Sequence, residues 1–471
     1  MARQLYSSVL IIGFVGPLGS GCSFIAHGLQ DQLGDRAHYY KLSKYLREIA
    51  KCQGISDPTT EQLQDIGNEL RHKKGLSVLA EMCIDQIRGE VRKAPTTWAD
   101  DHVVIIDSIR NEGEVRYLRS FPNFYLFSVF AHYEERRRRI VGPDRDLKKE
   151  EDFQRADERD QREDHAYGQQ VASCNYLSDA TIDNNETFPT RSKKQKRRLL
   201  CIRIEDDYVS LTIAAAFPHV EIQDRRPTTQ ETLMTAAYAV SKKSNCLNRH
   251  VGAVIAFVPK EKPAHARDAT AAPPFRIISS GYNEVPVGNT PCAYSGEGKC
   301  YRDFLQEQHA RRWKNCPNCG QPITQKMKCS ECGETVETIS RKCTTRECQK
   351  IPMFDYTCPG CKIKVFTHFL TGGKKTPTRM LDMCKALHAE ENALLGMPSF
   401  YQPAAEGQLV LFTTTFPCNL CANKIVGAGI RKVVFAEPYP MQEARQVLSE
   451  GGVEIVQFEG IKSRAYFKLF A

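Results

Sequence analysis

The sequence predicts an α/β protein of two domains, the second of which contains a metal-binding insert. Apolar strand-like runs alternate with helical runs in both halves of the chain, as is typical of α/β sheets. A glycine-rich loop follows the first apolar run, and cysteine pairs are concentrated in one polar segment. The 471 residues suffice for two ordinary domains and an insert, which we place at 1–222, 223–471 and 310–365.

The N-terminal half begins with a buried-strand pattern at residues 7–15, followed by a glycine-rich loop and a helical stretch at 24–33. This order is the context of a phosphate-binding loop, because backbone N–H groups and the helix dipole point at an anion. Cys22 stands where a lysine would neutralise the β- and γ-phosphates, so nucleotide binding is favoured over phosphoryl transfer. Ser23 could still hold Mg²⁺. The expected nucleotide contacts are Gly16, Gly19, Gly21, Cys22 and Ser23.

Two further strand candidates follow, at 103–110 and 124–130, and the second precedes a basic helical run at 134–140. This alternation predicts a parallel sheet. Together with the loop it resembles the nucleoside monophosphate kinase group of P-loop proteins. The charged stretch 155–164 could serve as a lid or phosphate clamp, although such runs are more commonly solvated helices.

The strongest motif lies near the C-terminus, where His388 and Glu390 precede the pair Cys418 and Cys421. One imidazole and two thiolates predict a catalytic zinc, because they leave the fourth tetrahedral position open for a water molecule. Zinc lowers the pKa of that water from about 15.7 to about 7, and Glu390 can then carry its proton to the ring nitrogen and the departing ammonia. The pattern is the general signature of zinc deaminases of nucleobases. The alternative is a structural zinc or a pair of buried cysteines.

Residues 230–471 resemble the deoxycytidylate deaminase family. The likeness is carried by the motifs at 249–254, 281–288, 388–394 and 414–422. It implies a cytidine-deaminase-like three-layer α/β/α domain, in which Asn283 hydrogen-bonds the sugar or base of the substrate. Asn392, just beyond the catalytic glutamate, is a second candidate for substrate contact. For both asparagines the alternative is a turn or cap residue.

Between Asn283 and His388 lie 104 residues, many more than a hairpin needs. Four cysteine pairs in this segment match two four-cysteine zinc sites of the ribbon type. The segment is too polar to bury a core, so metal would supply its folding energy. Disulfides are disfavoured because no secretory signal is present. Nucleic-acid binding by the ribbon stays an alternative. The expected structural-zinc ligands are Cys316, Cys319, Cys329, Cys332, Cys343, Cys348, Cys358 and Cys361, and further candidates, which are equally well buried thiols, are Cys246, Cys292 and Cys300.

The tandem of a kinase-like domain without the lysine and a deoxycytidylate-deaminase-like domain resembles the anti-phage dCTP/dCMP deaminases of bacteria. This resemblance implies conversion of dCTP and/or dCMP to dUTP or dUMP, which depletes the dCTP pool during infection, in a homo-oligomer such as a hexamer. An effector nucleotide in the N-terminal half is a further hypothesis. The alternatives are an editing deaminase acting on RNA or single-stranded DNA, and a non-enzymatic nucleotide sensor whose zinc sites are scaffolds.

The composition adds three expectations. No apolar run approaches the roughly 20 residues that a membrane span needs, so we expect a soluble, cytoplasmic protein. The 19 cysteines are used mostly as predicted zinc ligands, which indicates a reducing compartment. The formal charge of +9 is modest, but six of the eight residues at 191–198 are basic. Such a run is usually solvated, and it could also contact RNA or a polyphosphate.

Overall fold

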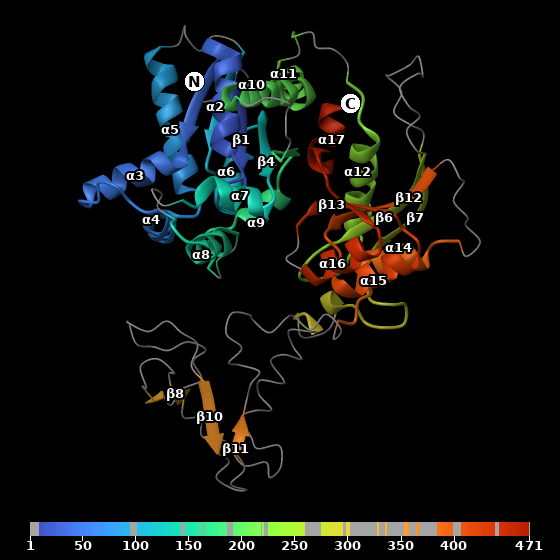
Figure 1. The fold of residues 1–471 in the computed structure, drawn as a ribbon. Coiled ribbons are helices and arrows are strands. Elements are labelled where there is room, and N and C mark those ends of the chain that lie inside the picture. Colours follow the sequence, from blue (N-terminus) through green and yellow to red (C-terminus); the bar gives the residue numbers. More distant parts are fainter. Residues whose placement is uncertain are drawn as a thin grey trace.

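The computed structural model shows two α/β bodies and a small separate sheet (Figure 1). Its described residues are 9–94, 101–142, 147–161, 163, 165–185, 192–217, 219–220, 225–259, 275–294, 298–301, 327–328, 335–336, 353–357, 364–366, 384–398, 407–438 and 442–470.

The first body is built on a six-stranded sheet with the order β15-β5-β4-β1-β3-β2. Every residue of the central strand β1 is buried, as expected for a parallel strand that is covered on both faces. Five strands pair in parallel, which confirms the predicted parallel sheet: β1 (Val9–Val15), β2 (Ala37–Lys41), β3 (His102–Asp107), β4 (Phe124–Phe130) and β5 (Ala180–Asp183). The sixth, β15 (Gly460–Ile461), is antiparallel.

Helices cover both faces of this sheet, and each face has its own apolar core. One core is formed with α3 (Leu42–Cys52), α4 (Thr60–Lys74), α5 (Val78–Lys93), α6 (Glu112–Leu118) and α9 (Val171–Tyr176). The other is formed with α2 (Cys22–Leu33), α10 (Lys193–Ile204), the π-helical turn η3 (Glu205–Val209), α11 (Ser210–Ala216) and α17 (Ser463–Leu469). The remaining helices, α7 (Tyr133–Ile140) and α8 (Glu150–Gln161), pack beside the glycine-rich loop.

The second body is a three-layer α/β/α arrangement, as predicted. Its five-stranded sheet has the order β14-β13-β12-β6-β7, with antiparallel pairing on either side of β6 and parallel pairing from β12 to β14. The strands are β6 (Gly252–Pro259), β7 (Arg276–Tyr282), β12 (Gly407–Thr415), β13 (Lys432–Glu437) and β14 (Glu454–Gln457). One face is covered by α14 (Ala389–Leu395), α15 (Asn419–Gly427) and α16 (Gln442–Glu450), and the other by α12 (Thr229–Ser241).

The chain crosses back into the first body near its C-terminal end. Strand β15 pairs with β5, and α17 lies between the two sheets against α11 and α12 (Figure 1). Lys462, only 3% exposed, joins the two bodies, because its ammonium binds Glu437 Oε1 at 3.0 Å and the carbonyl of Asn175 at 2.8 Å. The predicted domain boundary at 222/223 does not anticipate this return.

The insert contributes four short strands: β8 (Met327–Lys328), β9 (Thr335–Val336), β10 (Met353–Thr357) and β11 (Lys364–Phe366). They form an antiparallel sheet with the order β11-β10-β8-β9. The eight cysteines predicted to bind structural zinc lie outside the described residues, so the ribbon stays a prediction.

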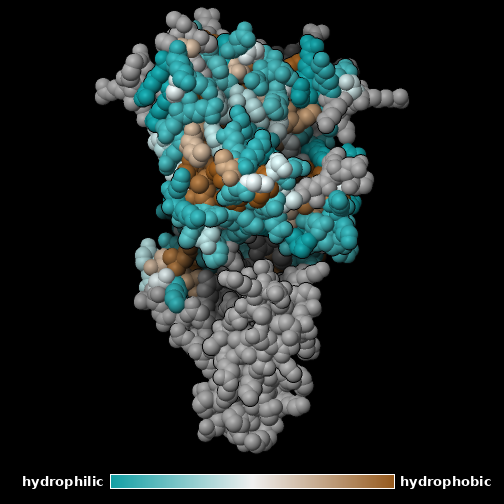
Figure 2. All heavy atoms as spheres, turned by 90° about the vertical axis from the view of Figure 1, so that its left-hand side faces the viewer, coloured by the Kyte–Doolittle hydropathy of each residue, from teal (hydrophilic) through white to brown (hydrophobic). Residues whose placement is uncertain are grey.

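The face drawn in Figure 2 is mostly hydrophilic where it is coloured, with apolar surface gathered near the middle of the upper part. No helix within the described ranges combines the length and apolarity that crossing a bilayer requires.

Candidate metal centre and active site

Two helix N-termini bring the predicted zinc ligands together. His388 is the N-cap residue of α14, and its backbone N–H donates to Glu391 Oε2 at 3.2 Å. Cys418 is the N-cap residue of α15, and Cys421 lies in the first turn of the same helix. Because the N-terminal end of a helix carries partial positive charge, this placement favours thiolates at both sulfur positions.

The spacing of these side chains fits one tetrahedral zinc. His388 Nδ1 lies 3.3 Å from Cys418 Sγ and 3.4 Å from Cys421 Sγ. A zinc with Zn–N near 2.0 Å and Zn–S near 2.3 Å places nitrogen and sulfur about 3.6 Å apart. Across the part of the chain that the structure describes, this is the one group of three such residues whose ligand atoms all lie within 4.8 Å of one another. The candidates Cys246, Cys292 and Cys300 form no such group there.

The two sulfurs differ in how they hold a proton. The pKa of the Cys418 thiol falls to about 4, mainly because Cys421 donates a hydrogen bond to its sulfur, with His388 beside it. The pKa of the Cys421 thiol rises, because that hydrogen bond and burial both favour its protonated form. The hydrogen bond therefore favours a thiolate at one of the two sulfurs, and a metal displaces protons when both become ligands.

Glu390 lies against the ligand atoms and is only 4% exposed. Its Oε1 is 3.4 Å from the hydroxyl of Thr413, and its Oε2 is 3.7 Å from Cys421 Sγ. Burial raises the pKa of this carboxyl, and His388 opposes that effect. A general acid/base works best with a pKa nearer the operating pH, so this shift suits proton transfer. The next residue along the helix, Glu391, binds Lys424 through Oε1, while its Oε2 accepts from His388 N.

Asn283 and Asn392 both lie where β7 ends beside α14. Asn283 is 9% exposed, and its amide accepts from Val251 N and donates to Arg249 O, each at 2.8 Å. Asn392 Nδ2 donates to Tyr282 O at 2.7 Å. Both side chains therefore hold backbone beside the metal centre, and each amide keeps donor or acceptor capacity for a substrate.

Gly281 explains why the motif before Asn283 requires a glycine. An added Cβ at Gly281 would lie 2.3 Å from Ala393 N and 2.4 Å from Ala389 O, both on the backbone of α14. These contacts are impossible, so only glycine allows α14 to pack this closely on β7. The close approach sets the position of His388 and Glu390 relative to the sheet.

We expect Asn283→Ala to lower the free energy of unfolding by roughly 1–3 kcal/mol, because the part-buried hydrogen bonds to Val251 N and Arg249 O are both lost. Urea denaturation measures this change. Asn423→Ala, which removes a hydrogen bond to Asn419 O on the surface of α15, is the matched control. If Asn283→Ala keeps full stability but loses kcat/KM, the asparagine acts through substrate contact alone and the positioning role is wrong.

The five residues predicted to contact a nucleotide lie together in the loop between β1 and α2 and in the first turn of α2. Gly19 and Gly21 adopt φ values of 82° and 101°, which glycine reaches without strain. Ser23 Oγ donates to Asp107 Oδ2 at 2.6 Å. Burial raises the pKa of the Cys22 thiol to about 12, so Cys22 is neutral and contributes no charge.

The protein's own polar groups engage this loop. Asp160 of α8 accepts from Leu18 N at 3.0 Å, and Arg136 of α7 donates to Leu18 O at 3.0 Å while pairing with Asp157. In the charged stretch 155–164, Asp157 and Asp160 are therefore buried beside the loop. The stretch is not a purely solvated helix. Nucleotide binding to this loop stays a prediction.

Sequence reasoning missed Lys41 at the end of the edge strand β2. Its ammonium lies 3.0 Å from Ser23 Oγ and 3.7 Å from Asp107, beside the position where Cys22 replaces the usual lysine. A lysine after the short strand-like run His38-Tyr-Tyr was the available signal, but only the pairing of β2 with β3 brings it to the loop.

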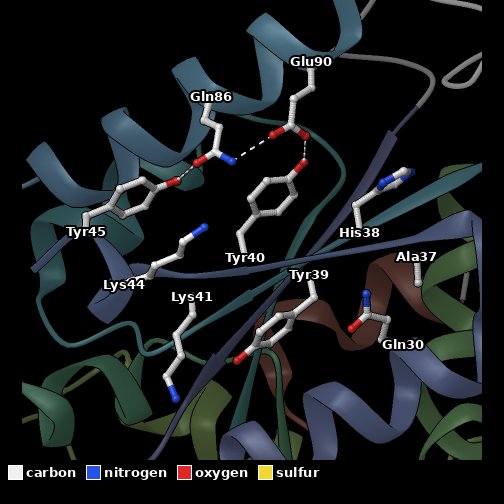
Figure 3. A pocket seen from close by; sticks show the side chains of 10 residues that line it. All are labelled: Gln30, Ala37, His38, Tyr39, Tyr40, Lys41, Lys44, Tyr45, Gln86 and Glu90. Carbon is white, nitrogen blue, oxygen red and sulfur yellow. Dashed lines mark hydrogen bonds between the residues drawn. The ribbon is translucent and has the colours of Figure 1, made fainter. Parts of the chain in front are cut away.

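A hollow of 380 Å³ lies along the open edge of β2 and far in sequence from the predicted metal ligands (Figure 3). The polar side chains that line this hollow are hydrogen-bonded to one another. Tyr45 donates to Gln86 Oε1 at 2.6 Å, Gln86 donates to Glu90 at 2.8 Å, and Tyr40 also donates to Glu90. None of the predicted site residues lines it.

Comparison with known proteins assigns the two halves to different relatives. Residues 227–437 match the family model described as the cytidine and deoxycytidylate deaminase zinc-binding region. The deoxycytidylate deaminase of Schizosaccharomyces pombe is 25% identical over 234 residues, which cover 50% of this chain and 45% of that protein. A UPF0200 protein of Methanothrix thermoacetophila is 32% identical over 132 residues, or 28% of this chain and 64% of that protein.

The chain therefore spans less than two thirds of the length of each of these relatives. Among solved structures, the dCMP deaminase of cyanophage S-TIM5 in complex with dCMP and dUMP is 19% identical, with 50% of this chain and 100% of that chain covered and a TM-score of 0.24. The region matched by the family model contains His388, Glu390, Cys418 and Cys421 as well as both asparagines.

Proposed function

We propose that this protein, which carries a cytidine/deoxycytidylate deaminase region at residues 227–437, is a zinc-dependent hydrolase that converts dCTP and/or dCMP to dUTP or dUMP. The observation that carries the proposal is the meeting of His388, Cys418 and Cys421 beside the buried carboxyl of Glu390. These groups come from two helices that are 30 residues apart in the chain.

In this reaction three residues bind the metal and one transfers protons. His388, Cys418 and Cys421 would hold the ion. When bound, zinc supplies Lewis-acid activation of a water molecule and lowers the pKa of that water to about 7. Glu390 accepts one proton of the attacking water at its carboxylate and delivers it to the ring nitrogen. It then carries the second proton of the same oxygen to the leaving amine. The C4–N bond breaks, a C4–O bond forms, and ammonia leaves.

The position of Glu390 suits both proton transfers. Its carboxyl lies within 4 Å of a metal-ligand sulfur, so a proton carried by Glu390 stays beside the reacting centre. Burial raises the pKa of the carboxyl, which makes it a stronger base than a solvated glutamate and lets it retain the proton until the amine departs. The surface pair of Glu391 with Lys424 gives that neighbour no such role.

Product analysis tests the proposal. The purified full chain, loaded with zinc, is incubated separately with dCTP, dCMP, CTP and cytosine-containing oligonucleotides, and the products are identified by mass spectrometry. We expect deamination of the deoxycytidine nucleotides. Deamination confined to oligonucleotides would instead identify an editing deaminase.

The resemblance to anti-phage dCTP/dCMP deaminases extends the proposal to depletion of the dCTP pool during infection. It is supported by the presence, in one chain, of a glycine-rich loop body and the deaminase region. Cells carrying the active protein should lose dCTP after infection, and cells carrying Glu390→Gln should retain it. Homo-oligomer formation, an effector nucleotide with Mg²⁺ at Ser23, and a cytoplasmic location stay predictions.

A further inference from the structure

A second, smaller hollow of 110 Å³ lies at the seam between the first sheet and α17. Three cationic side chains line it: Arg119 from the end of α6, and Arg464 and Lys468 from α17. One carboxylate, Asp179, also lines it and binds Arg119 at 2.7 Å. Cations therefore outnumber carboxylates by three to one, which favours an anion in the hollow.

Tyr125 on β4 lines the same hollow and lacks a partner for its hydroxyl. The side chain is 1% exposed, and its Oη makes no hydrogen bond to any residue that the structure describes. Asp179 is already engaged, because its Oδ2 accepts from Leu126 N at 2.7 Å as well as from Arg119. Leaving a buried hydroxyl unpaired is costly, so the hydroxyl points to an acceptor that the chain itself does not supply.

The two cations on α17 are placed to share one ligand. Arg464 and Lys468 are four residues apart, so they lie on the same face of the helix, where like charges repel. Lys468 Nζ lies 4.4 Å from the centre of the Tyr125 ring. Burial lowers the pKa of this ammonium. An anion between these groups would relieve the repulsion and accept from the tyrosine at the same time.

We propose that this hollow is a phosphate-binding site, which takes inorganic phosphate or the terminal phosphate group of a nucleotide. A hollow of 110 Å³ has room for a five-atom oxyanion. Arginine guanidinium groups bind phosphate in bidentate geometry, and the Tyr125 hydroxyl adds a fixed neutral donor.

The site joins segments from both ends of the chain. Tyr125 and Arg119 belong to the first body, whereas α17 follows directly after Lys462, whose ammonium binds Glu437. The carbonyl of Glu437 accepts from Phe416 N at 2.9 Å, two residues before the metal ligand Cys418. Bound phosphate would therefore hold α17 against the first body, close to the contact between the two bodies that Lys462 and Glu437 form. This inference stands independently of the deaminase chemistry.

Phosphate titration of the zinc-loaded full chain tests the proposal, with thermal unfolding as the readout and sodium chloride at matched ionic strength as the reference. A ligand that binds only the folded state raises Tm in a saturable way. We expect such a rise with phosphate and not with chloride. Tyr125→Phe should weaken phosphate binding roughly tenfold, because a hydrogen bond to a charged group is lost.

Tyr125→Phe should also raise the Tm of the phosphate-free protein, because the unpaired hydroxyl is gone. The double variant Arg464→Gln/Lys468→Gln changes two exposed residues and should abolish the phosphate-dependent rise, whereas Lys51→Gln, on the exposed end of α3, should leave it intact. An equal Tm rise in wild type, Tyr125→Phe and the double variant would overturn the site, as would a rise that chloride reproduces.

ATP distinguishes the two sources of phosphate. Tighter binding of ATP than of inorganic phosphate, lost in the Arg464→Gln/Lys468→Gln variant, assigns the site to the terminal phosphate of a nucleotide. Phosphate binding that is lost in this variant while ATP binding is unchanged assigns it to inorganic phosphate. Binding of both ligands that survives the double variant contradicts the proposal.

Discussion

Glu390→Gln should reduce kcat for deamination of dCTP or dCMP by roughly 10³-fold or more, because the variant has no base to take the proton of the attacking water. Positioned acid–base groups contribute about 10²–10⁴-fold to catalysis. Glutamine keeps the shape of the side chain and removes a charge that is costly to bury, so stability should be equal or higher. Ammonia release measures the rate, and thermal unfolding with elemental analysis measures stability and zinc content.

Glu391→Gln is the matched control for this experiment. It removes the same charge one position along α14. The glutamine oxygen can still accept from His388 N, and the lost ion pair with the half-exposed Lys424 contributes at most about 1 kcal/mol, so activity should fall less than roughly fivefold. A Glu390→Gln protein with wild-type turnover would show that the proton moves through another group.

The Cys418→Ser variant should contain one zinc ion fewer per chain and should show no measurable deamination. Serine is a poor zinc ligand beside one imidazole and one thiolate, and the lowered pKa of the Cys418 thiol favours an anion at this position. Elemental analysis of purified protein counts the zinc. The result differs from that for Glu390→Gln, in which zinc content is retained.

Cys52→Ser controls for the loss of a thiol, because Cys52 is exposed at the end of α3 in the other body. Its zinc content and activity should equal those of the wild type. If Cys418→Ser retains full zinc and full turnover, His388 and Cys421 do not form the centre that the geometry indicates.

Short-range patterns in the sequence predict much of this architecture. The apolar run at 7–15 gives β1, which spans Val9–Val15, and the helix expected at 24–33 is α2, which begins two residues earlier at Cys22. The strand expected at 124–130 is β4, at Phe124–Phe130. Periodicity and turn residues act over a few positions, so the sequence carries this information directly.

The metal ligands were predictable for the same reason. The spacing from His388 to Glu390 and from Cys418 to Cys421 covers only a helical turn, so ligand type and separation are encoded locally. That these two helices meet at one point is confirmed by the structure, in which β12 and the parallel strand β13 place α15 beside α14.

By itself, then, the sequence determined the two α/β patterns, the predicted set of metal ligands and the altered glycine-rich loop. Only the tertiary structure decided which distant groups meet: Lys41 with Ser23, Asp160 with the loop backbone, and α17 with Tyr125. The last contact joins residues more than 300 positions apart, and it exists because β15 adds to the edge of the first sheet. Strand order and the return of the chain set such contacts, since they depend on which surfaces pack together and not on the spacing of residues along the chain.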